Sequence, residues 1–403
     1  MNTRNIAGPL VRGSDFWGRD RDRAALWALL DKGDVLLNGP RRYGKSSLMC
    51  SLLDQPQPAW TVVMLDVEYV ETPAEFLTEL SAALVQTSAI RKLWEKTKRA
   101  PGAFLSWITA GIEGIEIGAE NIGQAKLNLR KSLTPDTWPE LTEQLFAELS
   151  HHDHSLLLII DEFPWMIANF IDQDPEQAVH FLKWFRAIRQ KTRKSPVRAL
   201  LGGSVNLEPR LEQLGREALI NDLQRYHLRP LSLADAVSFV REVLDAEGVP
   251  FDAETPAEIV RVADCGVHFF LQVLISECLA EARHHAGSKL TVDLVEPVYN
   301  ERVLGPPNRS RFSHYHTRLK QHYGALERAA RIVLALLTEQ ERESRDHLVE
   351  VLRAAGEDVS VDRVLALLES DYYVSRELDQ VSFSSGFLRD WWLRNVPAPA
   401  GAR

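Results

Sequence analysis

The sequence has few cysteines and no long apolar run. Among its 403 residues are three cysteines, and they stand neither in a CxxC pair nor at metal-ligand spacing. This pattern excludes a disulfide framework and a cysteine-based zinc site. No apolar stretch approaches the roughly 18 residues that a membrane-spanning helix needs, and residues 1–16 lack the apolar core of a signal peptide. We therefore expect a cytoplasmic protein with no membrane segment, whose cysteines are reduced and buried: Cys50, Cys265 and Cys278.

The sequence also lacks an excess of positive charge. It has 56 Asp and Glu against 47 Lys and Arg, a formal net charge of −9. This balance argues against nonspecific nucleic-acid binding by the whole chain, although a local basic face stays compatible with it. There is no internal repeat or low-complexity tract. The length exceeds that of a single hydrophobic core, so we expect two or three domains.

Strand and helix patterns alternate in the first half of the chain. Short apolar runs predict buried strands, and the apolar periodicity between them predicts helices, which together indicate a parallel α/β sheet. One helix has strong boundary signals, because Thr72, Pro73 and Glu75 form an N-cap, a first-turn proline and a capping-box glutamate. Period-two alternation across 112–130 predicts an inserted hairpin. The expected strands are 34–38, 61–70, 155–166 and 197–204, and the expected helices are 46–53, 73–86, 141–149 and 175–191.

The second half of the chain has a different pattern, because no strand is expected between residue 231 and the hairpin near the C-terminus. Helical patterns cover 232–246, 256–263 and 267–284, and a Pro-, Arg- and His-rich stretch, 303–323, connects them to the last part of the chain. That part predicts three helices followed by a hairpin at 371–385, which is a winged-helix pattern. The three helices are 326–338, 345–354 and 361–369.

The stretch GPRRYGKS, residues 39–46, carries the clearest chemistry. It matches GxxxxGK[ST], with a strand before it and a helix after it. In such a loop, backbone N–H groups point at phosphate oxygens and the helix adds its positive N-terminal end. Lys45 can then reach the β- and γ-phosphates, and the Ser46 hydroxyl can ligate Mg²⁺. The alternative is a chance glycine turn before a helix.

Two further expected strands end in polar residues. Asp161 and Glu162 follow an apolar run, at the edge where open α/β sheets place their ligands. Asp161 is suited to hold Mg²⁺ through water and Glu162 to act as general base on the attacking water. Ser204, near Asn206, follows the next strand and is our candidate sensor of the γ-phosphate, with a solvated serine in a glycine turn as the alternative.

These motifs together resemble the archaeal-type P-loop ATPases, a branch close to the STAND and Orc/Cdc6-like members of the AAA+ superfamily. GPRRYGKSSL at 39–48 is very similar to their phosphate loop, and IDEF at 160–163 to their Walker B motif. FWGRDRD at 16–22 resembles their N-terminal box, Gly203-Ser204 their sensor strand, and LRPLS at 228–232 the entry to their helical lid. The resemblance covers roughly residues 1–285 by motif.

The resemblance implies which residues contact the nucleotide and the metal. ATP and Mg²⁺ are the implied cofactors, with Ser46 and Asp161 at the metal and Glu162, Lys45 and Ser204 in catalysis. The residues expected to bind the nucleotide are Phe16, Gly18, Arg19, Gly39, Pro40, Arg41, Arg42, Tyr43, Gly44, Lys45, Ser46 and Ser47.

Two departures from the family pattern stand out. Gly266-Val267-His268 replaces the lid's usual G-x-P turn, which puts a nucleotide contact from the lid in doubt. The family's arginine before the lid has no single counterpart here. Arg225 is our candidate for a trans-acting finger, with Arg210 and Arg216 as alternatives.

The implied architecture is an α/β P-loop NTPase with a parallel, AAA+-like sheet, followed by a helical lid and a C-terminal winged-helix domain. We expect these domains: a P-loop ATPase domain at 1–230 with a hairpin insertion at about 112–130, a lid at 231–300, a connector at 301–324, a winged-helix-like domain at 325–395 and a tail at 396–403.

The sequence leaves three functional hypotheses open. The first is a Mg²⁺-dependent ATPase switch that couples nucleotide state to a protein partner or to self-assembly. The second is a DNA-associated loader or remodelling factor that uses the winged helix and the basic connector, and the third is a nucleotide-binding adaptor that scarcely hydrolyses. Residues 325–403 hold 14 Asp and Glu against 10 Lys and Arg, which favours a protein partner over DNA for that domain.

Overall fold

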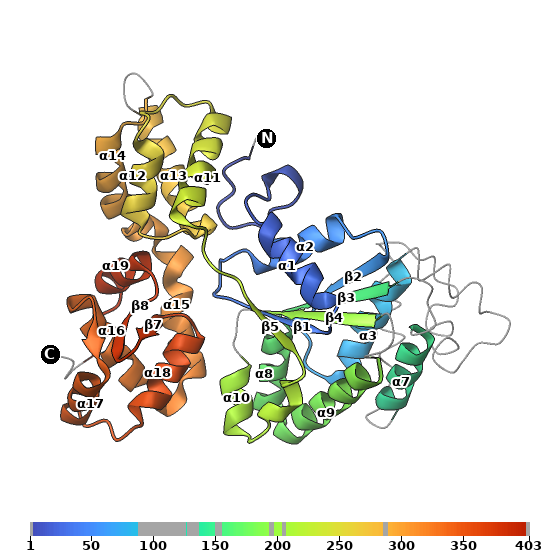
Figure 1. Cartoon of the computed structure of the whole chain (residues 1–403). Coiled ribbons are helices and arrows are strands. Elements are labelled where there is room, and N and C mark those ends of the chain that lie inside the picture. The colour runs from blue at the N-terminus through green and yellow to red at the C-terminus, as the bar shows by residue number, and fades with distance from the viewer. Residues whose placement is uncertain are drawn as a thin grey trace. The chain divides into compact units, whose positions relative to one another are not determined.

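The computed structural model describes residues 3–87, 126, 137–149, 155–192, 197–203, 207–284 and 289–399. The chain divides into two compact units (Figure 1). The sheet unit comprises Arg19–Gly39 and Lys45–Leu228, and the helical unit comprises Met1–Gly18, Pro40–Gly44 and Arg229–Arg403. Residues 40–44 of the phosphate loop thus group with the helical half of the chain.

The sheet unit is built on five parallel strands in the order β2-β3-β4-β1-β5. Its central strands are continuous apolar runs that are buried on both faces, as expected of a covered parallel sheet. The strands are β1 (Val35–Asn38), β2 (Trp60–Asp66), β3 (Ser155–Asp161), β4 (Val197–Gly202) and β5 (Gln224–His227).

Helices cover both faces of this sheet (Figure 1). Alternate strand residues, such as Leu36, Leu158 and Leu201, share one apolar core with Phe76 and Phe181 of the helices on that face. On one face lie α3 (Pro73–Gln86), α7 (Trp138–Leu149), α8 (Phe163–Gln173) and α9 (Pro175–Thr192), and on the other α1 (Asp20–Leu30) and α2 (Lys45–Asp54). The predicted α/β fold class is confirmed.

Several sequence-based boundaries agree with the structure and others do not. Helix α3 begins at Pro73, and the Thr72 side chain accepts a hydrogen bond from the Glu75 backbone N–H, as the capping pattern predicts. The strand predicted within 155–166 ends at Asp161, at the carboxylates where it was expected to terminate, and the remaining residues 163–166 begin α8. Helix α10 (Glu208–Gln213), a 3₁₀ turn at Glu217–Ile220 and strand β5 were not predicted.

The predicted hairpin at 112–130 lies outside the described residues except for Lys126. Lys126 is helical, not extended, and its ammonium pairs with the Glu79 carboxylate of α3 at 2.6 Å.

In the helical unit, four described helices occupy the region that the sequence predicts to be a lid. These helices are α11 (Leu233–Glu247), α12 (Thr255–Ala263), α13 (His268–His284) and α14 (Val292–Val298), followed by single turns at Tyr299–Val303 and Pro306–Asn308. Cys265 and Cys278 are free and buried in this unit, as Cys50 is in the sheet unit. The expected connector is itself a helix, α15 (Arg309–His322), and its Phe312 and Tyr315 are buried. These aromatic side chains are therefore part of the core and do not form an exposed platform for stacking bases.

The rest of the unit has the predicted winged-helix arrangement. A three-stranded antiparallel sheet in the order β6-β8-β7 packs with three helices, and a last helix closes the fold. The elements are α16 (Glu327–Glu339), β6 (Glu343–Ser344), α17 (Arg345–Ala354), α18 (Val361–Ser370), β7 (Val374–Glu377), β8 (Gln380–Phe383) and α19 (Gly386–Asn395). Trp391 and Trp392 of α19 are 2% and 1% exposed, so this helix is docked on the core.

Among the described residues, no helix has both the length and the apolar character that spanning a membrane requires.

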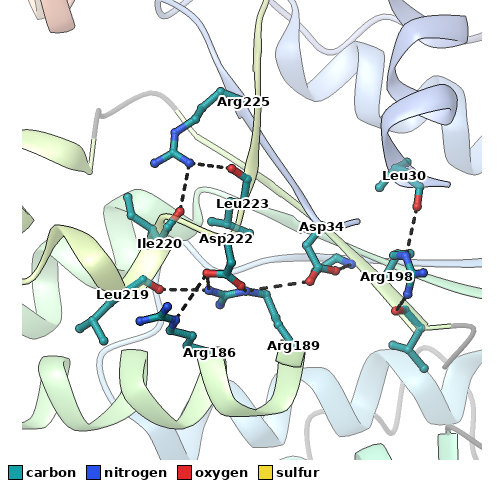
Figure 2. Close-up of polar contacts among 12 residues, drawn as sticks. Leu30, Asp34, Arg186, Arg189, Arg198, Leu219, Ile220, Asp222, Leu223 and Arg225 are labelled. Carbon is teal, nitrogen blue, oxygen red and sulfur yellow. Dashed lines mark hydrogen bonds and ion pairs between the residues drawn. The ribbon is translucent and has the colours of Figure 1, made fainter. Parts of the chain in front are cut away.

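A polar network lies at the amino end of the sheet (Figure 2). The Arg189 guanidinium donates to both oxygens of Asp222, at 3.1 and 2.9 Å, and to the Leu219 carbonyl at 3.1 Å. Asp34, just before β1, accepts from the Ala199 backbone N–H at 2.7 Å, and burial raises the pKa of its carboxyl above the ordinary value. Arg198 donates to the Leu30 carbonyl at 3.1 Å. The sequence places a cluster of basic residues at the end of α9 and the start of β4, and its members Arg189 and Arg198 thus serve internal structure.

Replacing Arg189 with Met should lower the free energy of unfolding by about 2–4 kcal/mol, because it leaves the Asp222 carboxylate without its main partner. Denaturant unfolding followed by tryptophan fluorescence measures this loss. Arg186→Met is the matched control on the same helix, since Arg186 lies 3.9 Å from Asp222 and is more exposed. It should cost less than about 1 kcal/mol, and equal losses in the two variants would contradict this interpretation.

Candidate functional site

The phosphate loop leaves the carboxyl end of β1 at Gly39. A Cβ atom on Gly39 would lie 3.3 Å from Leu228 Cβ and 3.4 Å from the Leu228 carbonyl oxygen, so a side chain would be crowded there. The Leu228 backbone N–H donates to the Asn38 carbonyl at 2.9 Å, which holds the chain after β5 against the start of the loop. At the far end, Gly44 has a φ of +86°, a conformation that glycine adopts without strain. Glycine is thus favoured at Gly44 by its backbone conformation, and a side chain at Gly39 would press against Leu228.

Lys45 and Ser46 begin α2 directly after the loop. Lys45 is 6% exposed, and its ammonium donates to the Gly39 carbonyl at 2.6 Å. The Ser46 side chain is hydrogen-bonded to Asp161 of β3. The structure therefore brings together the predicted phosphate-binding lysine, the predicted metal-binding serine and the predicted metal-binding aspartate.

Asp161 is a buried carboxyl at the end of β3, with 5% exposure. Burial raises its pKa to about 6; the hydrogen bond to Ser46 opposes this shift, and the neighbouring Glu162 and Asp66 carboxylates add to it. A carboxylate that is costly to ionise when alone is stabilised by a cation. This environment therefore suits a Mg²⁺-facing ligand.

Glu162 makes a tight turn between β3 and α8. Its φ is +57°, and its backbone N–H donates to Asp161 Oδ1 at 3.0 Å. A positive φ is uncommon for a residue other than glycine, and such strain is often found at functional sites. The turn separates the two carboxylates, with Asp161 on the strand and Glu162 at the head of the following helix.

The end of β4 lies beside both carboxylates. A Cβ on Gly203 would be 3.3 Å from Glu162 Oε2, and one on Gly202 would be 2.7 Å from Met49 Sδ and 3.8 Å from Asp161 Oδ1. A side chain at Gly202 would have to displace the end of the Met49 side chain, and one at Gly203 would collide with Pro164 of α8, 2.6 Å away. The candidate sensor Ser204, one residue further on, lies outside the described residues.

Two polar residues at this edge were not predicted as site residues. Asp66 ends β2 and is in register with Asp161, so a third carboxylate lies at the strand end beside the predicted metal ligand. Asn38 ends β1 and is buried, and its Nδ2 has no hydrogen-bond partner among the described residues. Their strand-end positions were the signal that the sequence offered.

Residues 40–44 at the apex of the loop have contacts within the helical unit. The Tyr43 backbone N–H closes a turn on the Pro40 carbonyl at 3.4 Å, and the Tyr43 side chain is buried. Arg41 is exposed, whereas Arg42 donates to the Gly8 carbonyl at 3.2 Å. Ser47, in the first turn of α2, is buried in the sheet unit.

The N-terminal box is divided between the two units. In the helical unit, Gly18 has a φ of +72° after Phe16 and Trp17, and the Trp17 indole donates to Glu242 of α11 at 2.6 Å. Arg19, in the sheet unit, pairs with Asp22 at 3.2 Å. The contact of Phe16, Gly18 and Arg19 with a nucleotide stays a prediction.

The replaced lid turn has a structural role. A ring nitrogen of His268 lies 3.2 Å from the Trp17 carbonyl oxygen, within hydrogen-bond distance. The Leu231 backbone N–H donates to the Gly266 carbonyl at 2.8 Å, and a Cβ on Gly266 would lie only 2.1 Å from the Leu231 carbonyl oxygen. Gly266 is therefore required by close backbone contact, and His268 supports the box.

Arg225, the candidate finger, makes contacts within its own unit (Figure 2). It lies on β5 and donates to Glu208 at 2.8 Å and to the carbonyls of Ile220 and Leu223 at 3.1 and 2.6 Å. A role in trans would require it to give up these bonds. Arg210 pairs with Asp172 at 2.8 Å, while Arg216 is exposed. The identity of a finger stays a prediction.

Within the described residues, no cluster of three or more His, Cys, Asp or Glu could hold a metal ion. Mg²⁺ in nucleotide sites is bound by one or two protein oxygens together with substrate phosphates and water. The pair formed by Ser46 and Asp161 fits that kind of site.

No family model and no curated protein matches the sequence. Solved structures do match its fold. A Walker-type ATPase of Pyrococcus abyssi superimposes with a TM-score of 0.66 at 16% identity, covering 96% of this chain and 99% of that chain. The ORC2 protein of Aeropyrum pernix, solved in ADPNP–ADP complexes, superimposes with a TM-score of 0.53 at 12% identity, covering 92% and 90%. The chain therefore has the P-loop, AAA+-like fold of these archaeal Walker-type and Orc proteins, which confirms the resemblance at the level of the fold.

Proposed function

We propose that this protein is a Mg²⁺-dependent ATPase that acts as a switch, coupling its nucleotide state to a protein partner or to self-assembly. One observation carries the proposal: Lys45 and Ser46 after β1 meet Asp161 and Glu162 after β3 at one edge of the sheet. The two similar solved structures are a Walker-type ATPase and a protein in complex with ADPNP and ADP, which supports ATP as the nucleotide.

Each residue has a defined part in this proposal. Lys45 would exchange the Gly39 carbonyl for phosphate oxygens, with the N–H groups of the loop and the first turn of α2 beside it. Ser46 and Asp161 would hold Mg²⁺, whose chemistry is to neutralise charge on the β- and γ-phosphates. Glu162 would accept the proton of the attacking water.

The switch part of the proposal follows from the division of the chain. Gly39 and Lys45 belong to the sheet unit, and residues 40–44 between them belong to the helical unit. Nucleotide binding at this loop would favour one conformation of the loop over another, so its differential affinity can shift a conformational equilibrium.

Glu162→Gln should lower kcat for ATP hydrolysis by about 10²–10⁴-fold, because it removes the general base. MgATP binding should remain, since the phosphate loop and the metal ligands are unchanged. Phosphate release measures the first effect and calorimetric titration the second.

Glu176→Gln is the matched control, because Glu176 is an exposed glutamate in the first turn of α9. It should hydrolyse ATP at the wild-type rate. Unchanged turnover in Glu162→Gln would show that Glu162 is not the base and would favour a nucleotide-binding adaptor.

A DNA-associated ATPase is the second candidate, and the winged-helix arrangement is the observation that favours it. The charge of this domain argues against it. Arg363 is the single basic residue of α18, the helix in the recognition position, and Asp362 and Glu369 lie on the same helix.

Two measurements on the wild-type protein test these candidates: light scattering after size exclusion for self-assembly, and fluorescence anisotropy for DNA binding. If the switch acts through self-assembly, MgATP should increase the molecular mass of the wild-type protein. Fluorescence anisotropy at low salt should detect no binding to duplex or single-stranded DNA, with or without MgATP, because the winged-helix domain has few cations to replace counterions. Salt-dependent DNA binding would instead establish the second candidate.

A further inference from the structure

Arg42 has an unusual backbone conformation at the apex of the phosphate loop. Its φ is +72°, in the left-handed region that favours glycine. A long side chain is kept in this region when its surroundings fix it there. The contacts of the Arg42 side chain therefore bear on how the loop is held.

The Arg42 guanidinium makes two contacts in the helical unit. It donates to the Gly8 carbonyl at 3.2 Å, and its Cζ lies 4.6 Å from the centroid of the Phe269 ring. Phe269 is at the start of α13 and is 5% exposed. Its ring is 5.8 Å from that of Phe312 on α15, so the contact continues into the aromatic core of the unit.

Gly8 belongs to an N-terminal arm, residues 3–18, which the same unit holds in place. The Asn5 side chain donates to Ser276 of α13 at 2.8 Å, and Thr3 donates to Glu242 of α11 at 3.2 Å. Arg311 of α15 donates to the Ala7 carbonyl at 3.5 Å, next to the carbonyl that Arg42 uses. The arm thus contacts the loop, the lid and α15.

The cations at this apex are poorly compensated. Arg41 has no hydrogen bond or ion pair with any described residue, and Arg42 Nε is buried without a partner. Burial, followed by the positive charge of Arg41, lowers the pKa of Arg42, and Arg311 adds to the effect. Burial together with Arg41 and Arg42 lowers the pKa of the nearby His314 to about 3, so His314 adds no further charge at neutral pH. An anion bound in the loop would relieve this repulsion.

We propose that Arg42 is a positioning residue that couples phosphate binding in the loop to the N-terminal arm and to α13, through its bond to Gly8 and its contact with Phe269. This inference rests on the proposed function, because it assumes that the loop binds a triphosphate. A bound phosphate strengthens the arrangement of Arg42, and the arm and the lid become more rigid in response.

Hydrogen exchange of the full-length protein, with and without saturating MgATP, tests the proposal. In the wild type, MgATP should slow amide exchange in the arm and in α13 by about threefold to tenfold, the range expected from a cation–π contact and one hydrogen bond. It should also slow exchange in α2, where Lys45 and Ser46 report binding itself.

Arg42→Gly is the sharpest variant, because glycine adopts the left-handed backbone without strain and removes the whole side chain, including the guanidinium. At MgATP concentrations that saturate the variant, slowing of the arm and α13 should be lost, while slowing of α2 shows that the nucleotide is bound. Phe269→Leu, which keeps an apolar side chain on α13, should cause the same loss, and the double variant should lose no more than either single one.

The outcomes separate the two proposals. If α2 is protected in the wild type but the arm and α13 are not, or if their protection survives in both Arg42→Gly and Phe269→Leu, the coupling is wrong and the proposed function stands. If Arg42 only holds the arm in place, Arg42→Gly would raise amide exchange in the arm by the same factor with and without MgATP. The ratio of the two exchange rates would then equal that of the wild type, and this result also overturns the coupling. If α2 is not protected in the wild type, the proposed function fails and the inference with it.

Discussion

The structure depends on charge held at the carboxyl edge of a parallel sheet. Three polar groups meet there: the buried ammonium of Lys45, the hydroxyl of Ser46 and the buried carboxyl of Asp161. Lys45 and Ser46 follow the loop after β1, and Asp161 is the last residue of β3. Burial raises the pKa of Asp161 and the neighbouring Glu162 and Asp66 carboxylates add to this shift, so this edge is unfavourable for negative charge unless a cation is present. In the proposed function, a metal-bound triphosphate would supply both an anion for Lys45 and a cation for Asp161.

The polar groups at the two ends of the sheet differ in whether they are paired within the protein. At the amino end, Arg189, Asp222 and Asp34 pair among themselves, and their contacts hold α9 to the strands. At the carboxyl end, polar groups such as Asn38 Nδ2 have no partner among the described residues. Basic residues near α9 could be mistaken for a nucleic-acid surface from the sequence. Their internal partners instead assign several of them to stability.

Much of this arrangement was predictable because local patterns determine it. The glycine spacing of the loop and the Thr72–Pro73–Glu75 cap act over a few residues, and the structure agrees with both. Strand β5, Gln224–His227, was missed because it is a short polar edge strand without an apolar pattern. Helix α8 was missed because its apolar start at Phe163 continues the run of β3, and the turn at Glu162 has no distinctive sequence signal.

Contacts between distant segments were not predictable from local patterns. Phe312, Tyr315 and Leu319 have helical spacing, but the many Arg and His residues around them favoured a connector. The bond from Arg42 to Gly8 joins residues 34 positions apart, and motif matching assigned Arg42 only to nucleotide binding. Such contacts depend on how the whole unit packs, which a single sequence does not specify residue by residue.

Calorimetric titration of MgATP into the wild-type protein and into Lys45→Ala tests the central claim most directly. Lys45 is the one ammonium that the loop places against its own carbonyl, ready to exchange it for phosphate oxygens. The account predicts saturable binding to the wild type and at least about a tenfold loss of affinity in the variant, which corresponds to one charge-assisted bond. Equal affinity in the two proteins, or no binding to the wild type, would contradict it.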